Sequence, residues 1–515
     1  MSKILSIHLG HDSNVTFLNS ENEQCIILEL ERFYEERYYK FSHKQEEFDL
    51  ALDQILDLLK TRGVENDFDI LVVSKDCPEL KFPKVNYKRI EYCDHHLGHA
   101  IGAYCLSDFD NCHVLSYDGS GNDGCFNYYK FSDTKFEIIK KLDTNIGWGY
   151  QALAKYVIDV SSKTKNDLAL AGKLMGFSGY GESISPVKKI MKKFMEKYFI
   201  DHDDDLYTDF FNKIGIPNHV LVLHNAMGAC FAATIQEASE ELVLEFFNKE
   251  GVPENLCLTG GCALNILVNQ KLRDLGYNLF IPPNPSDCGL SLGYALYGRW
   301  LLTGKFSKLD PITYSGLWIQ DLDNLEKIKT KRENSTVNLS NLAGRLKSGE
   351  IIGVCRGGSE VGPRALGNRS ILCDPVFPEM KDILNRKIKK REWYRPFAGV
   401  CRLEDAHKFF EIDKNQECDF MVYCPKVRDE YKGALKSITH IDGTCRLQTV
   451  TREQNQFIYD LLSQEGLSET PVLLNTSFNI NGKPILSKAE TALEILDETE
   501  IDAVVIEDTI FESND

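Results

Sequence analysis

Two strand–turn–strand units, each closed by a turn rich in glycine and aspartate, constrain the fold of this chain most. The first occupies residues 4–18 around the turn Gly10-His11-Asp12, and the second occupies residues 114–131 around a turn from Asp118 to Gly124. Glycines in such turns expose backbone N–H groups. The pattern predicts two β-hairpins whose turns can bind phosphate oxygens.

Helices and strands alternate between and after these hairpins. Apolar residues at helical spacing in 46–60 precede a strand at 70–74, and helices at about 148–160 and 225–249 precede a strand at 256–258. This last strand ends in Thr259-Gly260-Gly261, where a glycine pair allows a ligand to approach the backbone closely. The alternation predicts an α/β fold.

A weakening of the apolar pattern divides the chain. Polar residues dominate 303–340, after which a helical stretch at 342–346 and a strand at 351–355 begin a new α/β unit. A chain of 515 residues is too long for one ordinary core. We therefore predict two domains, residues 1–330 and residues 331–515.

Charge and cysteine content indicate the compartment and the partners of the protein. The net charge of −18 opposes broad attraction to a phosphate backbone, and the 16 cysteines include no C-x-x-C pair. The first ten residues read as a strand rather than a leader, and no apolar stretch is long enough to cross a membrane. We expect a cytoplasmic protein with buried free thiols and no membrane partner.

Arginine is distributed unevenly. Ten of the 18 arginines lie between Arg356 and Arg452, and none occurs from residue 90 to 272. The planar guanidinium fork binds phosphate and carboxylate groups. The cluster favours an oxyanion site in the C-terminal part over a solvated basic face.

The segment Asp94-His95-His96-Leu97-Gly98-His99 predicts a metal site. If it is helical, His95 and His99 lie four residues apart on one face, where two imidazoles can reach one ion. An isolated pair of this kind is more often a pair of surface or capping histidines. Asp118 and Asp287, at the ends of strand-like runs, could complete a set that suits Fe²⁺, Mn²⁺ or Zn²⁺, although each alone could simply cap a helix or form a turn.

Several strings together resemble one family, the NodU/CmcH/TobZ O-carbamoyltransferases. They are the Gly-His-Asp turn, His-His-Leu-Gly-His, Tyr-Asp-Gly-Ser-Gly, Thr-Gly-Gly-Cys-Ala-Leu-Asn, Gly-Pro-Arg-Ala-Leu-Gly-Asn-Arg-Ser, Arg-Pro-Phe-Ala and Leu-Asn-Thr-Ser-Phe-Asn, in this order over nearly the whole chain. The resemblance implies an N-terminal domain of actin-like ATPase fold, like tRNA threonylcarbamoyltransferase, and a C-terminal YrdC-like α/β domain. It also implies that carbamoyl phosphate and ATP, with Mg²⁺, form carbamoyl-adenylate in the second domain, with release of pyrophosphate and phosphate. The carbamoyl group then passes to a hydroxyl in the first domain.

The resemblance also implies roles for individual residues. Iron, or another divalent metal, would be held by His95, His99, Asp118 and Asp287. The nucleotide in the first domain would be held by Lys173, Gly260, Gly261 and Asn265, with His11 as base or carbamoyl-pocket residue. Carbamoyl phosphate and ATP in the second domain would be held by Lys389, Arg391, Arg446 and Ser477, with Arg364, Arg369 and Asn475 as further candidates. The string Gly172-Lys173-Leu174-Met175-Gly176-Phe177-Ser178 departs from the expected pattern, and an exposed loop is an alternative interpretation of it.

Other functions stay open at this level. A related enzyme could transfer a carbamoyl or threonylcarbamoyl group to an amine or thiol, and an actin-fold kinase or ATPase would release ADP rather than AMP. The acceptor is expected to be a small-molecule alcohol, a sugar or a natural product. A hydroxymethylated pyrimidine in a nucleotide or in DNA is a second hypothesis, and a homodimer is neither required nor excluded.

Overall fold

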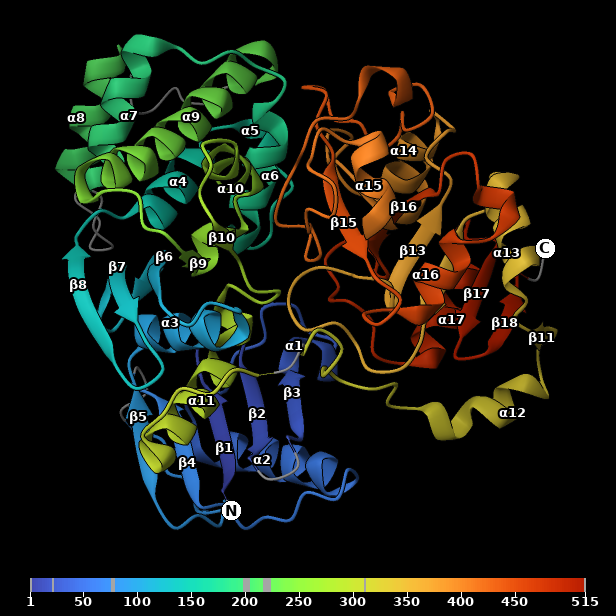
Figure 1. Cartoon of the computed structure of the whole chain (residues 1–515), viewed down its shortest axis with the longest axis horizontal. Coiled ribbons are helices and arrows are strands. Elements are labelled where there is room, and N and C mark those ends of the chain that lie inside the picture. The colour runs from blue at the N-terminus through green and yellow to red at the C-terminus, as the bar shows by residue number, and fades with distance from the viewer. Residues whose placement is uncertain are drawn as a thin grey trace.

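The computed structural model describes residues 2–20, 23–75, 79–197, 204–215, 224–309 and 312–513, without the side chains of residues 204–207. Three sheets organise the chain, two in the N-terminal half and one in the C-terminal half (Figure 1). The α/β fold predicted from the sequence is confirmed. Within the described residues, no helix combines the length and apolar character needed to cross a membrane.

The first two sheets have the same topology. The first has the order β3-β2-β1-β4-β5 and the second the order β10-β9-β6-β7-β8. In each, three antiparallel strands are followed by two strands that extend the sheet in parallel. The strands are β1 (Lys3–His8), β2 (Asn14–Asn19), β3 (Cys25–Glu29), β4 (Ile70–Ser74), β5 (Ile90–Cys93), β6 (Cys112–Gly121), β7 (Gly124–Phe131), β8 (Phe136–Leu142), β9 (Leu256–Thr259) and β10 (Leu279–Phe280). This duplicated architecture is the one that the resemblance to actin-like ATPases implies.

Two helices cross between these sheets. Helix α3 (His95–Leu106) packs on β6 and β9, and helix α11 (Leu290–Thr303) packs on β1, β2 and β4 (Figure 1). A Cβ on Gly293 would lie 2.0 Å from the carbonyl oxygen of Gly98, so the helices meet backbone to backbone. The close crossing brings the N-terminal ends of both helices, which carry the candidate metal ligands, to one place.

The remaining helices of the N-terminal half pack on the two sheets or on one another. They are α1 (Leu30–Phe33), α2 (Gln45–Lys60), α4 (Ile146–Ala154), α5 (Ile158–Ser161), α6 (Leu170–Ser178), α7 (Ser185–Lys197), α8 (Asp204–Ile214), α9 (Asn225–Glu250) and α10 (Ile266–Asp274), with short helical turns η1 (Asp167–Ala169), η2 (Gly261–Leu264) and η3 (Asp287–Gly289). The predicted helices 46–60 and 225–249 are confirmed. The predicted helix 148–160 is two helices, because the chain leaves helical geometry between Lys155 and Val157.

The C-terminal half is built on an eight-stranded mixed sheet of order β11-β18-β17-β12-β13-β16-β14-β15 (Figure 1). Its strands are β11 (Asn334–Thr336), β12 (Ile352–Cys355), β13 (Arg369–Cys373), β14 (Ala398–Arg402), β15 (Arg446–Val450), β16 (Val472–Ser477), β17 (Ala503–Ile506) and β18 (Thr509–Glu512). Its helices and helical turns, with the two that precede it, are η4 (Leu322–Asn324), α12 (Leu325–Lys329), α13 (Leu339–Lys347), α14 (Met380–Ile383), η5 (Leu384–Ile388), α15 (Leu403–Phe409), η6 (Asp429–Tyr431), α16 (Gln456–Leu462), η7 (Glu465–Leu467) and α17 (Ala489–Glu498).

The two halves are joined by buried polar contacts. Arg32, next to β3, is 1% exposed and donates to the carbonyl oxygens of Glu360 and Gly362 at 2.7 and 2.6 Å. Its Nε lies 2.7 Å from Glu29, whose carboxylate also accepts the N–H of Gly362. A buried arginine with all of these partners fixes the loop at 360–362 against the first sheet.

Candidate functional site

Helix α3 places its histidines through caps from the second hairpin turn. The N–H of His95 donates to Asn122 Oδ1 at 2.9 Å, and the N–H of His96 donates to Asp123 Oδ1 at 3.0 Å. The His96 ring lies 2.8 Å from Ser116 Oγ and 2.9 Å from the carbonyl oxygen of Gly124. The turn thus satisfies the first N–H groups of the helix and fixes the helix relative to β6.

The four predicted metal ligands come together. One donor atom from each of His95, His99, Asp118 and Asp287 lies within 4.8 Å of the other three. His99 Nε2 is 3.5 Å from Asp118 Oδ2 and 3.4 Å from Asp287 Oδ1. His95 Nε2 is 3.6 Å from the same Asp287 oxygen. Two buried imidazoles and two carboxylates form a donor set that fits Fe²⁺, Mn²⁺ or Zn²⁺.

Burial and charge set the protonation of this group. Burial lowers the pKa of His95 to about 3. Burial also disfavours charge on His99, but Asp118 and Asp287 outweigh it and raise the pKa of His99 to about 9. The facing histidines hold the pKa of Asp287 well below its usual range despite the burial of its carboxyl group. Without a metal, the proton on His99 compensates part of the carboxylate charge.

The first hairpin adds two histidines to the same place. His11 Nδ1 lies 3.0 Å from Asp12 and Nε2 lies 3.4 Å from Asp287. Burial opposes charge on His11, but these two carboxylates raise its pKa to about 9. Without a metal the protonated ring is therefore favoured at neutral pH, and the role of His11 as base or carbamoyl-pocket residue stays a prediction.

His8 is a site residue that the sequence interpretation missed. It ends β1, is 2% exposed, and its Nε2 lies 3.8 Å from Asp287 Oδ2. Burial lowers its pKa to about 4, so the ring is neutral. The duplicated topology is the signal that could have found it, because β1 and β6 are equivalent strands and Asp118 lies at the matching end of β6.

The glycine pair after β9 supports Asp118. Gly260 has a φ of +90°, and a Cβ there would lie 2.2 Å from the carbonyl oxygen of Tyr117. The N–H of Gly261 donates to Asp118 Oδ2, and the N–H of Gly119 donates to Oδ1 at 2.6 Å. In this structure, therefore, the pair orients a candidate metal ligand.

Asn265 does not lie free for a nucleotide. Its Oδ1 caps α10 by accepting from Leu267 and Val268, and its amide is paired with Gln236 at 3.0 and 3.1 Å. Capping and pairing thus use the hydrogen-bonding groups of this side chain, and its nucleotide-binding role stays a prediction.

A second group of polar residues lies at one end of the C-terminal sheet. Strands β14 and β15 are parallel and begin there, while β16 is antiparallel to β14 and ends there. The start of β15 brings Arg446 to this end, and the end of β16 brings Ser477. Lys389, Arg391 and Arg395 come from the segment that leads into β14. Together with Arg364 they form what we call the cationic cluster: Arg364, Lys389, Arg391, Arg395 and Arg446.

Lys389 is bound to the end of β16. It is 2% exposed, and its ammonium donates to Ser477 Oγ at 3.2 Å, to the Ser477 carbonyl oxygen, and to Asn479 Oδ1 at 2.7 Å. Burial and the charges of Arg391 and Arg395 hold the pKa of Lys389 well below its usual range. The next residue, Lys390, has a φ of +47° and turns the chain between the two candidate residues.

The cations of the cluster act on one another. Burial lowers the pKa of Arg446 to about 10, with a further contribution from Arg395. The pKa of Arg364 is also lowered by burial and then by Arg446 and Arg395. The Nε groups of Arg446 and Arg364 are buried without a hydrogen-bond partner. Neighbouring cations with unused donors are the arrangement that a polyanion stabilises.

Two predicted candidates have structural roles. Arg369 is fully buried, and its guanidinium donates to the carbonyl oxygens of Arg356, Asn368, Gly357 and Leu317. Asn475 is fully buried as well, and its amide donates to Gln448 Oε1 at 2.7 Å and to Ala365 O at 3.2 Å. Most donors of these two side chains are therefore used inside the fold, although Nε of Arg369 is buried without a hydrogen-bond partner, and their role in ligand binding stays a prediction.

Lys173 lies on a helix, in contrast to the loop interpretation of its segment. Leu170, Leu174 and Phe177 of α6 are buried at helical spacing, and this packing explains the helix. The ammonium of Lys173 donates to Thr164 Oγ1 at 2.7 Å and lies 2.6 Å from Glu392 Oε1. Lys173 is thus brought to the segment that carries the cationic cluster.

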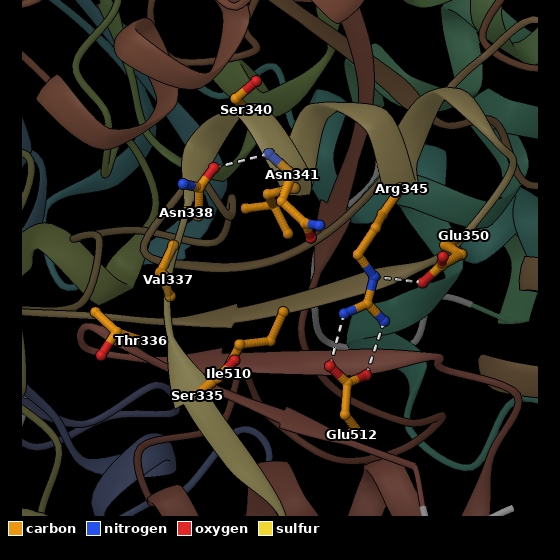
Figure 2. Close-up of a pocket in the computed structure, with 11 residues that line it drawn as sticks. Ser335, Thr336, Val337, Asn338, Ser340, Asn341, Arg345, Glu350, Ile510 and Glu512 are labelled. Atoms are coloured by element: carbon orange, nitrogen blue, oxygen red, sulfur yellow. Dashed lines mark hydrogen bonds and ion pairs between the residues drawn. The ribbon is translucent and has the colours of Figure 1, made fainter.

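A cavity of about 710 Å³ lies elsewhere, at the outer edge of the C-terminal sheet (Figure 2). It is lined by β11, α13 and β18. Its arginine, Arg345, forms a two-bond ion pair with Glu512 at 2.7 and 2.8 Å and another ion pair with Glu350 at 2.7 Å. This arginine is fully paired within the protein, and no lining residue belongs to either candidate site.

Two family models match this chain, one over the part that carries the candidate metal ligands and one over the part that carries the cationic cluster. Residues 64–296 match the family model of the carbamoyltransferase N-terminus, and residues 343–513 match that of the carbamoyltransferase C-terminus. The chain belongs to the carbamoyltransferase family. This places it among transferases and confirms the family resemblance of its motifs.

Individual relatives in this family cover much of the chain. Nodulation protein NolO of Bradyrhizobium diazoefficiens is 31% identical over 80% of this chain and 77% of its own length. Nodulation protein NolNO of Sinorhizobium fredii is 32% identical over 82% of this chain, which spans 64% of that relative. The 3'-hydroxymethylcephem-O-carbamoyltransferase of Streptomyces clavuligerus is 35% identical over 49% of this chain and 48% of its own length.

Solved structures resemble the carbamoyltransferase-family chain only distantly. Full-length HypF in a phosphate- and nucleotide-bound form aligns with a TM-score of 0.34 and 14% identity over 60% of this chain and 56% of that chain. The HypF of T. kodakarensis aligns with a TM-score of 0.35 and 14% identity over 59% and 48%. A likeness of this degree does not bear on function.

Proposed function

We propose that this protein is an ATP-dependent O-carbamoyltransferase with two reaction centres. The observation that carries the proposal is the pair of sites in one chain, a buried set of imidazoles and carboxylates in the N-terminal half and the cationic cluster in the C-terminal half. Family membership supports a carbamoyl group as the one transferred. The cephem relative, by its name, carbamoylates a hydroxymethyl group, which supports an alcohol as acceptor.

The cationic cluster suits formation of carbamoyl-adenylate. Water releases phosphate from carbamoyl phosphate and leaves carbamate, whose oxygen attacks the α-phosphorus of Mg²⁺-bound ATP and expels pyrophosphate. Negative charge gathers on the phosphoryl oxygens in both steps. Arg391, Arg446 and Arg364 would neutralise this charge, and Lys389 with Ser477 would hold the acyl group in place. A kinase or ATPase has no need of such a second cationic site.

The N-terminal site suits the transfer step. The acceptor oxygen attacks the carbamoyl carbon, the bond to AMP breaks, and the hydroxyl proton leaves to solvent. His95, His99, Asp118 and Asp287 would hold Fe²⁺ or a related ion, which supplies Lewis-acid polarisation of the carbamoyl oxygen when bound. His11, protonated beside Asp12 and Asp287, would donate a hydrogen bond to the departing phosphate.

Product analysis tests the proposal directly. The purified full chain is incubated with Mg²⁺-ATP, carbamoyl phosphate and Fe²⁺, and pyrophosphate, AMP and ADP are separated by chromatography. The proposal expects pyrophosphate that forms only with carbamoyl phosphate. ADP without pyrophosphate would identify a kinase-like ATPase and overturn the proposal. Hydroxymethylated sugars, natural products and nucleosides then form the acceptor screen.

A further inference from the structure

A single carboxylate joins the two halves beside the cationic cluster. Glu392 Oε1 lies 2.6 Å from Nζ of Lys173, and its Oε2 lies 3.6 Å from NH1 of Arg395. Lys173 comes from α6 in the N-terminal half, whereas Arg395 belongs to the cluster. The side chains of Lys173 and Glu392 are only 9% and 10% exposed. This ion pair is therefore not one of the solvent-screened surface pairs that contribute little.

Aromatic contacts of the next two residues hold the backbone at Glu392 in place. The next residue, Trp393, packs edge to face on Tyr180 with ring centroids 4.9 Å apart. Tyr394 packs on Phe177 at 4.9 Å, and its hydroxyl donates to the Asp159 carbonyl oxygen at 3.2 Å. The segment 392–394 is thus docked on the N-terminal half, and the carboxylate is presented to Lys173 by a fixed backbone.

Most of the charged side chains around Glu392 are cations. Burial is the main cause that lowers the pKa of Lys389, Arg391 and Arg395. Arg391 and Arg395 lower the pKa of Lys389 further, and Arg395 and Arg446 lower that of Arg391 further, whereas the charge of Glu392 raises the pKa of both Arg391 and Arg395. Glu392 therefore serves as an internal counter-ion. Carboxylate and phosphate oxygens use the same donors, the ammonium of lysine and the fork of arginine.

We propose that Glu392 occupies the place of a nucleotide phosphate, and that binding of a nucleotide makes Lys173 and Arg395 exchange the Glu392 carboxylate for phosphate oxygens. The inference rests on the proposed function, in which this enzyme handles ATP and an adenylate. It assigns to Glu392 a role beyond interdomain packing. Because the exchanged pair joins the two halves, phosphate binding also loosens the contact between α6 and the segment that leads into β14.

The two possible roles of Glu392 predict different changes in nucleotide affinity when its charge is removed. If Glu392 competes with phosphate, its neutralisation removes a competitor and a repelling charge, so nucleotides bind more tightly. If Glu392 only holds the two halves together, the same change disturbs the site and nucleotides bind equally or more weakly. The isosteric change Glu392→Gln keeps the size of the side chain and its ability to accept a hydrogen bond.

The test is isothermal titration of the full-length protein with AMP and with Mg²⁺-ATP. We expect Glu392→Gln to lower the Kd of both ligands about tenfold, the effect of losing one charge-assisted competing contact. Glu35→Gln is the matched control. Glu35 lies in the N-terminal half, pairs with Lys488 of the C-terminal half at 3.2 Å, and its neutralisation changes the net charge equally. We expect the Kd values of this control to equal those of the wild type.

Further measurements keep the test decisive. Thermal unfolding checks that each variant is folded, and Glu392→Asp, which keeps the charge but shortens the side chain, should tighten binding less and in the same direction. Unchanged or weaker binding by folded Glu392 variants overturns the inference, as does equal tightening by Glu35→Gln. Wild-type release of pyrophosphate is measured separately, so failure of the proposed function is distinguishable from failure of this exchange.

Discussion

The two candidate centres differ in how their charges are compensated. In the N-terminal half, Asp118 and Asp287 face the imidazoles of His99 and His11, so opposite charges lie within 4 Å of one another. In the cationic cluster, burial and then the neighbouring cations lower the pKa of Arg364 and Arg446, and their two guanidinium Nε groups are buried without a hydrogen-bond partner. The first centre is prepared for a cation and the second for an anion.

The two centres also differ in what supports them. The N-terminal donors lie on elements of the duplicated core, where caps from Asn122 and Asp123 and the N–H of Gly261 fix their positions. Apart from Arg446 at the start of β15, the cluster lies on connecting segments at one end of a sheet, and Lys390 there adopts a left-handed conformation. Because the two centres are supported by different elements, we expect a substitution in one centre to change the activity or affinity of that centre and not of the other.

The largest expected effect concerns the metal. Asp118→Asn removes one of two carboxylates from the donor set, and we expect Fe²⁺ affinity to fall by at least about 100-fold, since even changes beyond the direct ligands cost 10- to 100-fold. Anaerobic equilibrium dialysis measures this affinity. Asp108→Asn, an exposed residue beyond the end of α3, changes the net charge equally and should bind Fe²⁺ as the wild type does. Equal loss in both variants would exclude a site at Asp118.

The complementary change affects the cluster. We expect Arg446→Ala to lower kcat/KM for carbamoyl-phosphate-dependent pyrophosphate release by about 100-fold, because one donor to the developing charge is lost. Fe²⁺ affinity should not change. Arg452→Ala is the control, since Arg452 is paired with Asp460 on the surface at 2.8 Å. A parallel fall in Fe²⁺ affinity in Arg446→Ala would contradict the separation of the centres.

The effect of a change of one pH unit on metal binding is expected to be smaller. Without a metal, His99 has a pKa of about 9 and carries a proton that the ion must displace. Fe²⁺ affinity should therefore rise with pH up to about 9 and fall by up to about tenfold for each unit below it. Competition with a chelator of known affinity across pH 6 to 9 measures the slope. An affinity independent of pH would show that His99 is neutral before the ion binds.

The smallest effect is on stability. A ligand at 100 times its Kd stabilises the folded state by about 2.7 kcal/mol, so pyrophosphate should raise Tm by several degrees through the unbalanced cluster. The same addition should shift Tm less in Arg446→Ala. An equal shift in the two proteins would mean that pyrophosphate binds outside the cluster. Differential scanning calorimetry at constant ionic strength provides the comparison.

The sequence was most informative where local patterns determine geometry. The spacing of His95 and His99 required only a helix to bring both rings to one face, and the two glycine-rich turns indicated the duplicated strands. It was least informative where the use of a donor depends on the folded chain. Arg369 and Asn475 stand in the same polar strings as the other candidates, and only the carbonyl and amide groups around them show that most of their donors are used inside the fold.

Two further residues, His8 and Glu392, could be placed in the sites only with the structure. His8 reads as an ordinary strand residue until the duplicated topology places the end of β1 opposite the end of β6. Glu392 reads as one acid in the basic run from Lys389 to Arg395, a signal that could have marked it. Its importance depends on Lys173, 219 positions earlier, which helix α6 brings to 2.6 Å from the Glu392 carboxylate.

The most direct test of the central claim, two separate reaction centres in one chain, is pyrophosphate release by the Asp118→Asn protein with ATP and carbamoyl phosphate. The account predicts release at the wild-type rate although Fe²⁺ binding is lost, because the cationic cluster alone forms the adenylate. Loss of pyrophosphate release together with metal binding, in a protein that unfolds at the wild-type temperature, would contradict it and indicate a single centre.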